Sequence, residues 1–229
     1  MTATLQGVCS MATRALLEEL AAAHSQRAGT PVAFVAMGGV EAARRVAAGE
    51  VFDVVALASD AIDGLVAAGR LDGAGKVDLA RSGVAVAVRA GAQRPDISTG
   101  GALRSAVLAA QGIAYSTGPS GVALVALFER WGIADDVRGR LVQAPPGVPV
   151  GSLLARGEAA LGFQQLSELI GVEGIDLLGP LSADVQITTV FSAAPSTRCA
   201  HPKAARALLE FMASAESAPI KRRYGMEPA

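Results

Sequence analysis

The chain has 229 residues, which is long enough for one domain or two small lobes with a sizeable core and excludes a peptide scaffold. Hydrophobic residues make up 51% of it but aromatic residues only 4%, so the core is expected to consist of Ala, Val, Leu and Ile, as in α/β proteins. Twenty Lys and Arg against 21 Asp and Glu give a net charge of -1, which leaves no broad basic field to hold a nucleic acid.

Short apolar runs alternate with helical patterns along the chain, a rhythm that is typical of parallel βαβ units. In the first third the pattern predicts strands at 3–9, 32–35 and 52–58 and helices at 12–27, 40–48 and 61–68. Ser10 or Thr13 is expected to cap the first of these helices and Asp60 the third, and Gly49 is expected to end the second.

The remainder of the chain continues the same rhythm. The pattern predicts strands at 84–88, 112–116, 141–143, 160–164 and 185–194, and helices at 102–110, 122–131, 150–156, 166–170 and 202–212. The charge run Lys221–Arg222–Arg223 is interpreted as a solvated helix end. No low-complexity linker separates two sequential domains, so two lobes would have to be joined through strands, and 84–88 and 185–194 are the best candidates.

Several kinds of site and location are not expected from this sequence. Cys9 and Cys199 lie near no Cys or His cluster, so we expect each of them to act as a small buried hydrophobic side chain. No metal site, disulfide or cofactor is expected. The uncharged stretch 105–128 is broken by Gly, Pro and polar residues, so it does not predict a membrane span of ~20 apolar residues. The first residues show no secretory leader, which predicts a cytoplasmic protein as the chain stands, or a periplasmic one if a leader was removed.

Four turns that follow predicted strands are candidates for a ligand site, because ligands bind beyond the carboxyl ends of strands in open α/β sheets. They are 9–13, 37–40, 116–121, and 144–150 with 164–165 close behind in sequence. Their small residues offer backbone N–H groups at helix starts, which favour an anion. Ser116, Thr117 and Ser120 make the third turn the strongest candidate, although the same residues also suit a plain cap and turn.

Few side chains suggest catalysis. His24 lies among leucines on a predicted helix, and His201 precedes Pro202 at a helix start, so both have structural explanations. No Ser/His/Asp arrangement can be proposed from the spacing. Glu168, at a strand-to-helix junction, is the carboxylate best placed to act as a base.

Several separated segments together resemble a known family. They are VCSMATRAL at 8–16, the glycine pair 38–39, RRVAAGE at 44–50, FDVV at 52–55 and GEAALGF at 157–163. In this combination the chain is similar to the molybdate-binding (ModA-like) proteins of ABC transporters, from about residue 5 to residue 228.

The resemblance implies an α/β, two-lobe type 2 periplasmic-binding-protein-like fold, with a ligand cleft between lobes that two crossing strands join. Lobe one would comprise residues 1–83 and 193–229, and lobe two residues 84–192. Carried over position by position, the ligand contacts would be Ser10, Met11, Gly38, Gly39, Ser116, Thr117, Ser120, Val148 and Gln165. The implied partners are a small anionic ligand and an ABC transporter permease, with no nucleic acid and no insertion into a membrane.

Two departures from the family pattern affect the ligand. The second turn reads Met37–Gly38–Gly39, without hydroxyls, and the last carries Gln164–Gln165 where molybdate-selective members have a tyrosine. Gln both donates and accepts hydrogen bonds, so it suits a carboxylate at least as well as a bare oxyanion. The predicted function is therefore capture of a small anion, either an oxyanion such as molybdate or a small organic acid.

Two other functions stay open. The family also resembles aconitate isomerase, which makes an isomerase or tautomerase of small carboxylic acids the alternative, with Glu168 as its base and backbone N–H groups of 116–121 stabilising the developing charge. The same fold serves as the ligand-sensing domain of regulators, but nothing in this chain resembles a DNA-binding segment.

Overall fold

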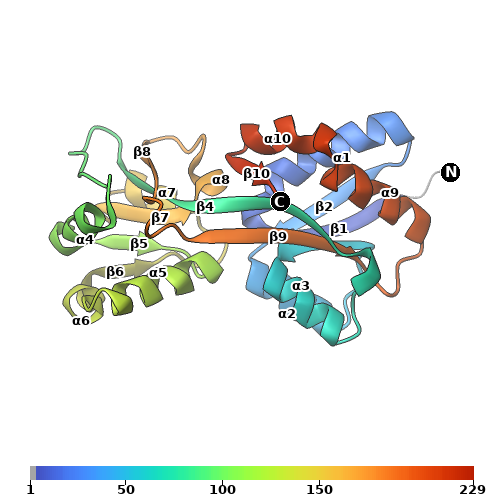
Figure 1. Ribbon diagram of the computed structural model, residues 1–229, viewed down its shortest axis with the longest axis horizontal. Coiled ribbons are helices and arrows are strands. Elements are labelled where there is room, and N and C mark those ends of the chain that lie inside the picture. Colours follow the sequence, from blue (N-terminus) through green and yellow to red (C-terminus); the bar gives the residue numbers. More distant parts are fainter. Residues whose placement is uncertain (1–3) are drawn as a thin grey trace. The chain divides into compact units, whose positions relative to one another are not determined.

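The computed structural model describes residues 4–229 and divides into two compact units (Figure 1). Unit 1 comprises the chain up to Arg81 together with Val190–Ala229, and unit 2 comprises Ser82–Thr189. The start of the first predicted strand, residue 3, lies outside the described residues. Within residues 4–229, no helix combines the length and the apolar character needed to cross a bilayer.

Unit 1 is a mainly parallel sheet covered by helices. Its strands are β1 (Leu5–Ser10), β2 (Val32–Met37), β3 (Val54–Ala58), the first part of β4 (Val77–Arg89), most of β9 (Thr188–Pro195) and β10 (Met226–Pro228). Its α-helices are α1 (Arg14–Ala28), α2 (Gly39–Ala47), α3 (Ser59–Ala67), α9 (Pro202–Ala213) and α10 (Ala218–Arg223), and its 3-10 helices are η1 (Met11–Thr13), η2 (Gly73–Gly75) and η4 (Ala215–Ser217). The strand order is β2-β1-β3-β9-β4, with β10 paired to β4.

Unit 2 repeats this plan with a smaller sheet. Its strands are β5 (Ile113–Tyr115), β6 (Leu141–Gln143), β7 (Leu161–Gln165), β8 (Ile175–Pro180) and the second part of β4. Its α-helices are α4 (Gly100–Ala109), α5 (Pro119–Arg130), α6 (Ala134–Val137), α7 (Val150–Ala155) and α8 (Leu166–Leu169), and η3 (Arg138–Arg140) is a 3-10 helix. The order is β4-β7-β5-β6, with β8 paired to β4.

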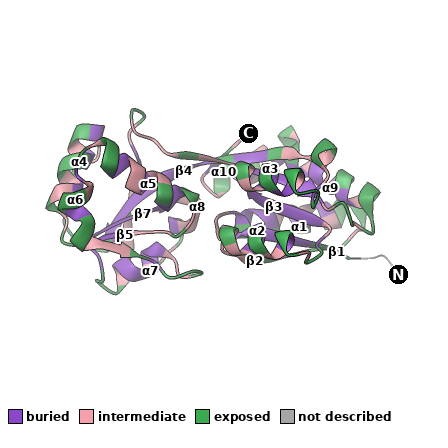
Figure 2. Cartoon of the chain, turned by 90° about the horizontal axis from the view of Figure 1, so that it is seen from below, coloured by how far each residue is buried: buried purple, intermediate pink, exposed green. Residues whose placement is uncertain are grey.

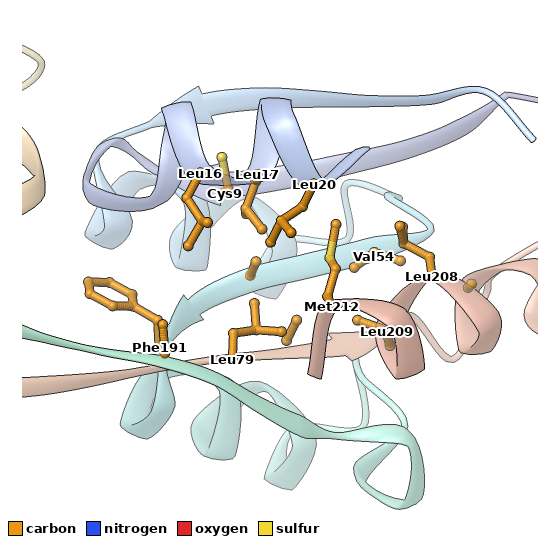
Figure 3. Close-up of a cluster of buried hydrophobic side chains, with 14 of the residues drawn as sticks. Cys9, Leu16, Leu17, Leu20, Val54, Leu79, Phe191, Leu208, Leu209 and Met212 are labelled. Atoms are coloured by element: carbon orange, nitrogen blue, oxygen red, sulfur yellow. The ribbon is translucent and has the colours of Figure 1, made fainter. Parts of the chain in front are cut away.

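Aliphatic side chains form the core of each unit. In unit 1, Leu16, Leu17 and Leu20 on α1 face Leu208 and Met212 on α9, which Figure 3 shows around the central strands. Their helical spacing places them on one face, and burying each such side chain contributes roughly 1.5–3 kcal/mol. Figure 2 shows the same division in both units, with buried strands and helices that expose their outer faces.

The chain passes between the units in two strands. β4 leaves unit 1 after Arg81, and β9 enters it again at Val190. The segments 84–88 and 185–194, predicted as the connecting strands, correspond to the second part of β4 and to β9.

Some local predictions were wrong. The strand predicted at 84–88 is only the second part of β4, which has 13 residues. β8 was not predicted, because its half-buried residues do not alternate with exposed ones. Asp60 does not cap α3: the helix begins at Ser59, and Asp60 Oδ1 accepts from the amide of Ala61 in its first turn, 2.9 Å away. Lys221 is fully buried and not solvated, whereas Arg222 and Arg223 are exposed as expected.

Candidate ligand-binding site

The β1-to-α1 turn of unit 1 is held by its own hydroxyl groups. Ser10 precedes η1 and is 6% exposed, and its Oγ lies 3.2 Å from Oγ1 of Thr13. Thr13 Oγ1 in turn donates to the carbonyl of Ser10, so neither hydroxyl caps the helix as predicted. Met11 is half-buried within η1. The first N–H groups of a helix lack partners within it, which makes this turn a source of hydrogen-bond donors.

The second turn of unit 1 lies beside the first. Parallel pairing of β1 with β2 places Ser10 opposite Met37, so both strands end at the same edge of the sheet. Gly38 precedes α2, and a Cβ atom at Gly39 would lie 3.7 Å from Cβ of Ser10. The structure therefore brings Ser10, Gly38 and Gly39 together at one edge.

In unit 2 the hydroxyl-rich turn between β5 and α5 is tightly folded. Ser116 Oγ lies 3.1 Å from Oγ of Ser120, which is buried, whereas Thr117 is exposed. A Cβ atom at Gly121 would lie only 1.9 Å from the carbonyl oxygen of Ser116, so glycine alone fits there. This close approach folds the turn over the first residues of α5, a helix of 12 residues.

The end of β7 carries a buried polar chain. The amide of Val150, at the start of α7, donates to Gln164 Oε1 at 2.8 Å, and Gln164 Nε2 donates to Glu168 Oε1 at 2.9 Å. Burial raises the pKa of Glu168 to about 7, although the hydrogen bond from Gln164 opposes the shift. The carboxyl group therefore exchanges its proton near neutral pH and can act as acid or base.

Gln165 has one free polar end. Its Nε2 donates to Thr189 Oγ1 at 2.7 Å, while Oε1 is buried without a hydrogen-bond partner among residues 4–229. A threonine hydroxyl can donate or accept, so the amide can turn over and present either an acceptor or an N–H donor at its free end. A buried polar atom of this kind costs stability until something pairs with it.

The fourth turn contributes mainly backbone. Val148 lies in the segment between β6 and α7, where its amide donates to the carbonyl of Pro145 at 3.0 Å. Its half-buried side chain packs against the cluster around Val150 and Leu153. Only the carbonyl and part of the side chain of Val148 are left for a ligand.

Strand pairing gathers the turns of unit 2 at one edge. β5 is parallel to both neighbours and places Tyr115 opposite Gln143 on β6 and Phe163 on β7. Ser116, which follows β5, and Gln164 and Gln165, the last two residues of β7, therefore lie at the same edge of the sheet. Each unit thus presents one edge of candidate turns.

The remaining polar candidates have structural roles. His24 is buried with its ring centroid 5.7 Å from that of Phe211, and burial lowers its pKa. Asp53 accepts from the amide of Gln6 at 2.9 Å and from the half-buried Cys199 Sγ at 3.3 Å. Across residues 4–229, no group of three or more His, Cys, Asp or Glu is placed to hold a metal ion.

One polar residue of unit 1 was missed by the sequence reasoning. Lys221 on α10 is fully buried, and its Nζ has no hydrogen-bond partner in the described part of the chain. The four-residue spacing from Ser217 to Lys221 places both residues on one helical face. The structure shows that this face is buried, since Ser217 is also fully buried. The burial of Lys221 was not predicted because Arg222 and Arg223 follow it, and a run of three basic residues is typical of a solvated helix end.

Comparison with known proteins assigns nearly the whole chain to one family. The family model described as bacterial extracellular solute-binding protein matches residues 5–227. An aconitate isomerase from a Pseudomonas species is 39% identical over 233 residues, which cover 98% of this chain and 88% of that protein.

Solved structures agree on the architecture. The periplasmic molybdate-binding protein of Azotobacter vinelandii has a TM-score of 0.79 at 21% identity and covers 97% of this chain and 98% of its own. The sulfate-binding protein SubI of Mycobacterium tuberculosis has a TM-score of 0.79 at 18% identity, over 100% of this chain and 88% of its own. The predicted two-lobe α/β class of fold is confirmed, whereas the molybdate-binding group in particular stays a prediction.

Proposed function

Because this chain belongs to the family of bacterial extracellular solute-binding proteins, we propose that it binds a small organic acid carrying two or three carboxylates. The proposed contacts are the turns at the sheet edges: Ser10, Met11, Gly38 and Gly39 in unit 1, and Ser116, Thr117, Ser120, Val148 and Gln165 in unit 2. By the family's usual role, the partner would be an ABC transporter permease, and the protein would act outside the cytoplasm.

The free end of Gln165 carries this proposal. It is a buried amide atom that only an added group can satisfy, at an edge that also holds the close hydroxyls of Ser116 and Ser120. Together these groups offer a carboxylate several donors at the start of a helix, where the dipole also favours negative charge. An amide that can present either end also suits the hydroxyl of a hydroxy acid.

Two further observations favour an organic acid over a bare oxyanion. The turn at Met37–Gly38–Gly39 supplies no side-chain hydroxyl to surround a tetrahedral anion. In unit 2, burial raises the pKa of Glu168 to about 7, so a compact dianion held beside this carboxyl group would have to draw in a proton in order to bind at neutral pH. Carboxyl groups spread along a carbon skeleton can avoid this contact.

A thermal-shift series tests the proposal. Citrate, cis-aconitate and trans-aconitate are expected to raise the melting temperature in proportion to RT ln(1 + [L]/Kd), which is about 2.7 kcal/mol at 100 times the Kd. Molybdate, sulfate and phosphate serve as compact inorganic controls. If only these inorganic anions stabilise the protein, the organic-acid proposal is wrong.

A second candidate function is isomerisation of an unsaturated carboxylic acid. It is favoured by the half-buried Glu168 at the same edge, with its pKa near neutrality, and by the relative named aconitate isomerase. Ionised Glu168 would take a proton from the carbon next to the double bond, the electron pair would move the double bond by one position, and the carboxyl of Glu168 would return a proton to the far carbon after exchange with solvent. The reaction is balanced without a further reactant. Backbone N–H groups of the β5–α5 turn would stabilise the negative charge between the two steps.

Proton NMR in deuterium oxide separates catalysis from binding. An isomerase is expected to exchange allylic protons of cis- or trans-aconitate for deuterium or to convert one acid into the other. Glu168→Gln preserves the acceptor for Gln164 but removes the base, so the exchange rate should fall about 100-fold or more. Tight binding by the native protein without exchange would leave capture as the function.

A further inference from the structure

The side chain of Lys221 is set in the core of unit 1 without a counter-ion. It is 0% exposed, and its Nζ makes no hydrogen bond within residues 4–229. Its neighbours on α10, Ile220 and Tyr224, pack against the hydrophobic cluster that includes Cys9, as Ala12 of η1 also does. α10 also packs on α1, the helix that follows the β1-to-α1 turn.

The carboxylates around α10 are already paired. The elements that pack most closely on it are α1, η4 and β10. Their four carboxylates each bind an arginine: Glu18 binds Arg14, Glu19 binds Arg223, Glu216 binds Arg27 and Glu227 binds Arg222. The two arginines that follow Lys221 are therefore surface ion-pair partners, and no acidic group of these elements remains for Lys221.

Burying an unpaired ammonium group inside a protein lowers the stability of the folded state. Water solvates it far better than aliphatic side chains do, and this desolvation lowers the pKa of Lys221. An aliphatic side chain at this position would pack without that cost. A cation is useful in such a place if an anion that binds there supplies the missing partner.

We propose that Lys221 is a ligand-binding residue, whose ammonium pairs with a carboxylate of the bound acid. This inference rests on the proposed function and narrows it. A ligand that reaches both Lys221 and the donors of the β1-to-α1 turn in the same unit needs at least two anionic groups on a flexible or extended skeleton. The unbranched stem of lysine gives the ammonium several orientations, and α10 packs on α1, which begins directly after the β1-to-α1 turn.

Isothermal titration calorimetry with citrate and trans-aconitate tests this role. Lys221→Met removes the charge but fills nearly the same volume, and we expect the Kd to rise about 10–100-fold. Its melting temperature without ligand should equal or exceed that of the native protein, since an unpaired buried charge has been removed. The matched control is Arg222→Met, which removes an exposed charge from the neighbouring position and should leave the Kd unchanged.

Two further variants, Lys221→Arg and Lys221→Gln, complete the series. They test whether the charge of Lys221 contributes to ligand affinity if the Met variant does not fold. Arg keeps the charge and should retain affinity within about 10-fold, whereas Gln should lose as much as Met. Equal Kd values for the native protein and the uncharged variants overturn the role of Lys221 and leave the proposed function standing. An equal loss of affinity in Arg222→Met would show that the effect comes from long-range charge, and it would likewise overturn a direct contact between Lys221 and the ligand. If the native protein binds neither acid, the proposed function fails and this inference fails with it.

Discussion

At the scale of single residues, Glu168 has the environment that most directly suits chemistry. Its only resolved influences are burial, which raises the pKa to about 7, and the hydrogen bond from Gln164, which lowers it. An anion that binds close to a half-buried carboxyl group disfavours its ionised form. Ligand binding beside it would raise the pKa further and draw in a proton.

The raised pKa predicts a pH dependence of stability. In the unfolded chain Glu168 ionises near its ordinary pKa of about 4.5, so its ionisation is disfavoured in the folded protein. The stability of the native protein should therefore decline relative to Glu168→Gln as the pH rises from about 4.5 to about 7, and level off above. Thermal melts of both proteins across this range measure the difference. Glu158→Gln, at an exposed ion pair with Arg156, is the control and should show no such trend.

At the scale of elements, the β5–α5 turn depends on one glycine. The carbonyl of Ser116 lies where any side chain at Gly121 would begin, so the serine hydroxyls can meet only because this position has no Cβ. The sequence showed the serines and glycines of this turn, and their interpretation as either a ligand turn or a plain cap could not be decided from spacing. The contact between Ser116 and Ser120 defines the geometry of the turn, while its use by a ligand stays a proposal.

Gly121→Ala is expected to disrupt this turn. The 1.9 Å approach forces the backbone of Ser116 to move, which should lower the free energy of unfolding by about 1–3 kcal/mol and weaken ligand binding. Urea denaturation and the ligand-induced thermal shift measure the two effects. Gly139→Ala, in η3 of the same unit, meets no atom within 4 Å and should change stability by about 0.5 kcal/mol or less. A Gly121→Ala protein as stable as that control would contradict the packing argument.

At the scale of the whole molecule, two α/β units share one chain that crosses in β4 and returns in β9. Unit 1 is completed only when the chain returns, since β9 pairs with β3 and α9 covers the cluster that α1 begins. Unit 1 is built from two separate pieces of sequence, whereas unit 2 is the continuous stretch between them. This path explains why no linker composition marked a boundary and why strand-like segments marked the crossings.

The sequence by itself determined the features that depend on near neighbours in the chain. The strand-turn-helix rhythm, the apolar faces of α1 and α9, and the helix end at Gly49 all follow from periodicity and local backbone preference. The sequence also marked Glu168 as the candidate base, because it stands where a strand meets a helix.

Only the tertiary structure decided the properties that depend on distant partners. The pKa of Glu168 depends on burial, and the free end of Gln165 was revealed by its bond to Thr189. Lys221 is buried because α10 packs on α1, although its neighbours in sequence are exposed arginines. Desolvation and hydrogen bonding are set by whichever atoms surround a group in space, and spacing along the chain does not specify those atoms.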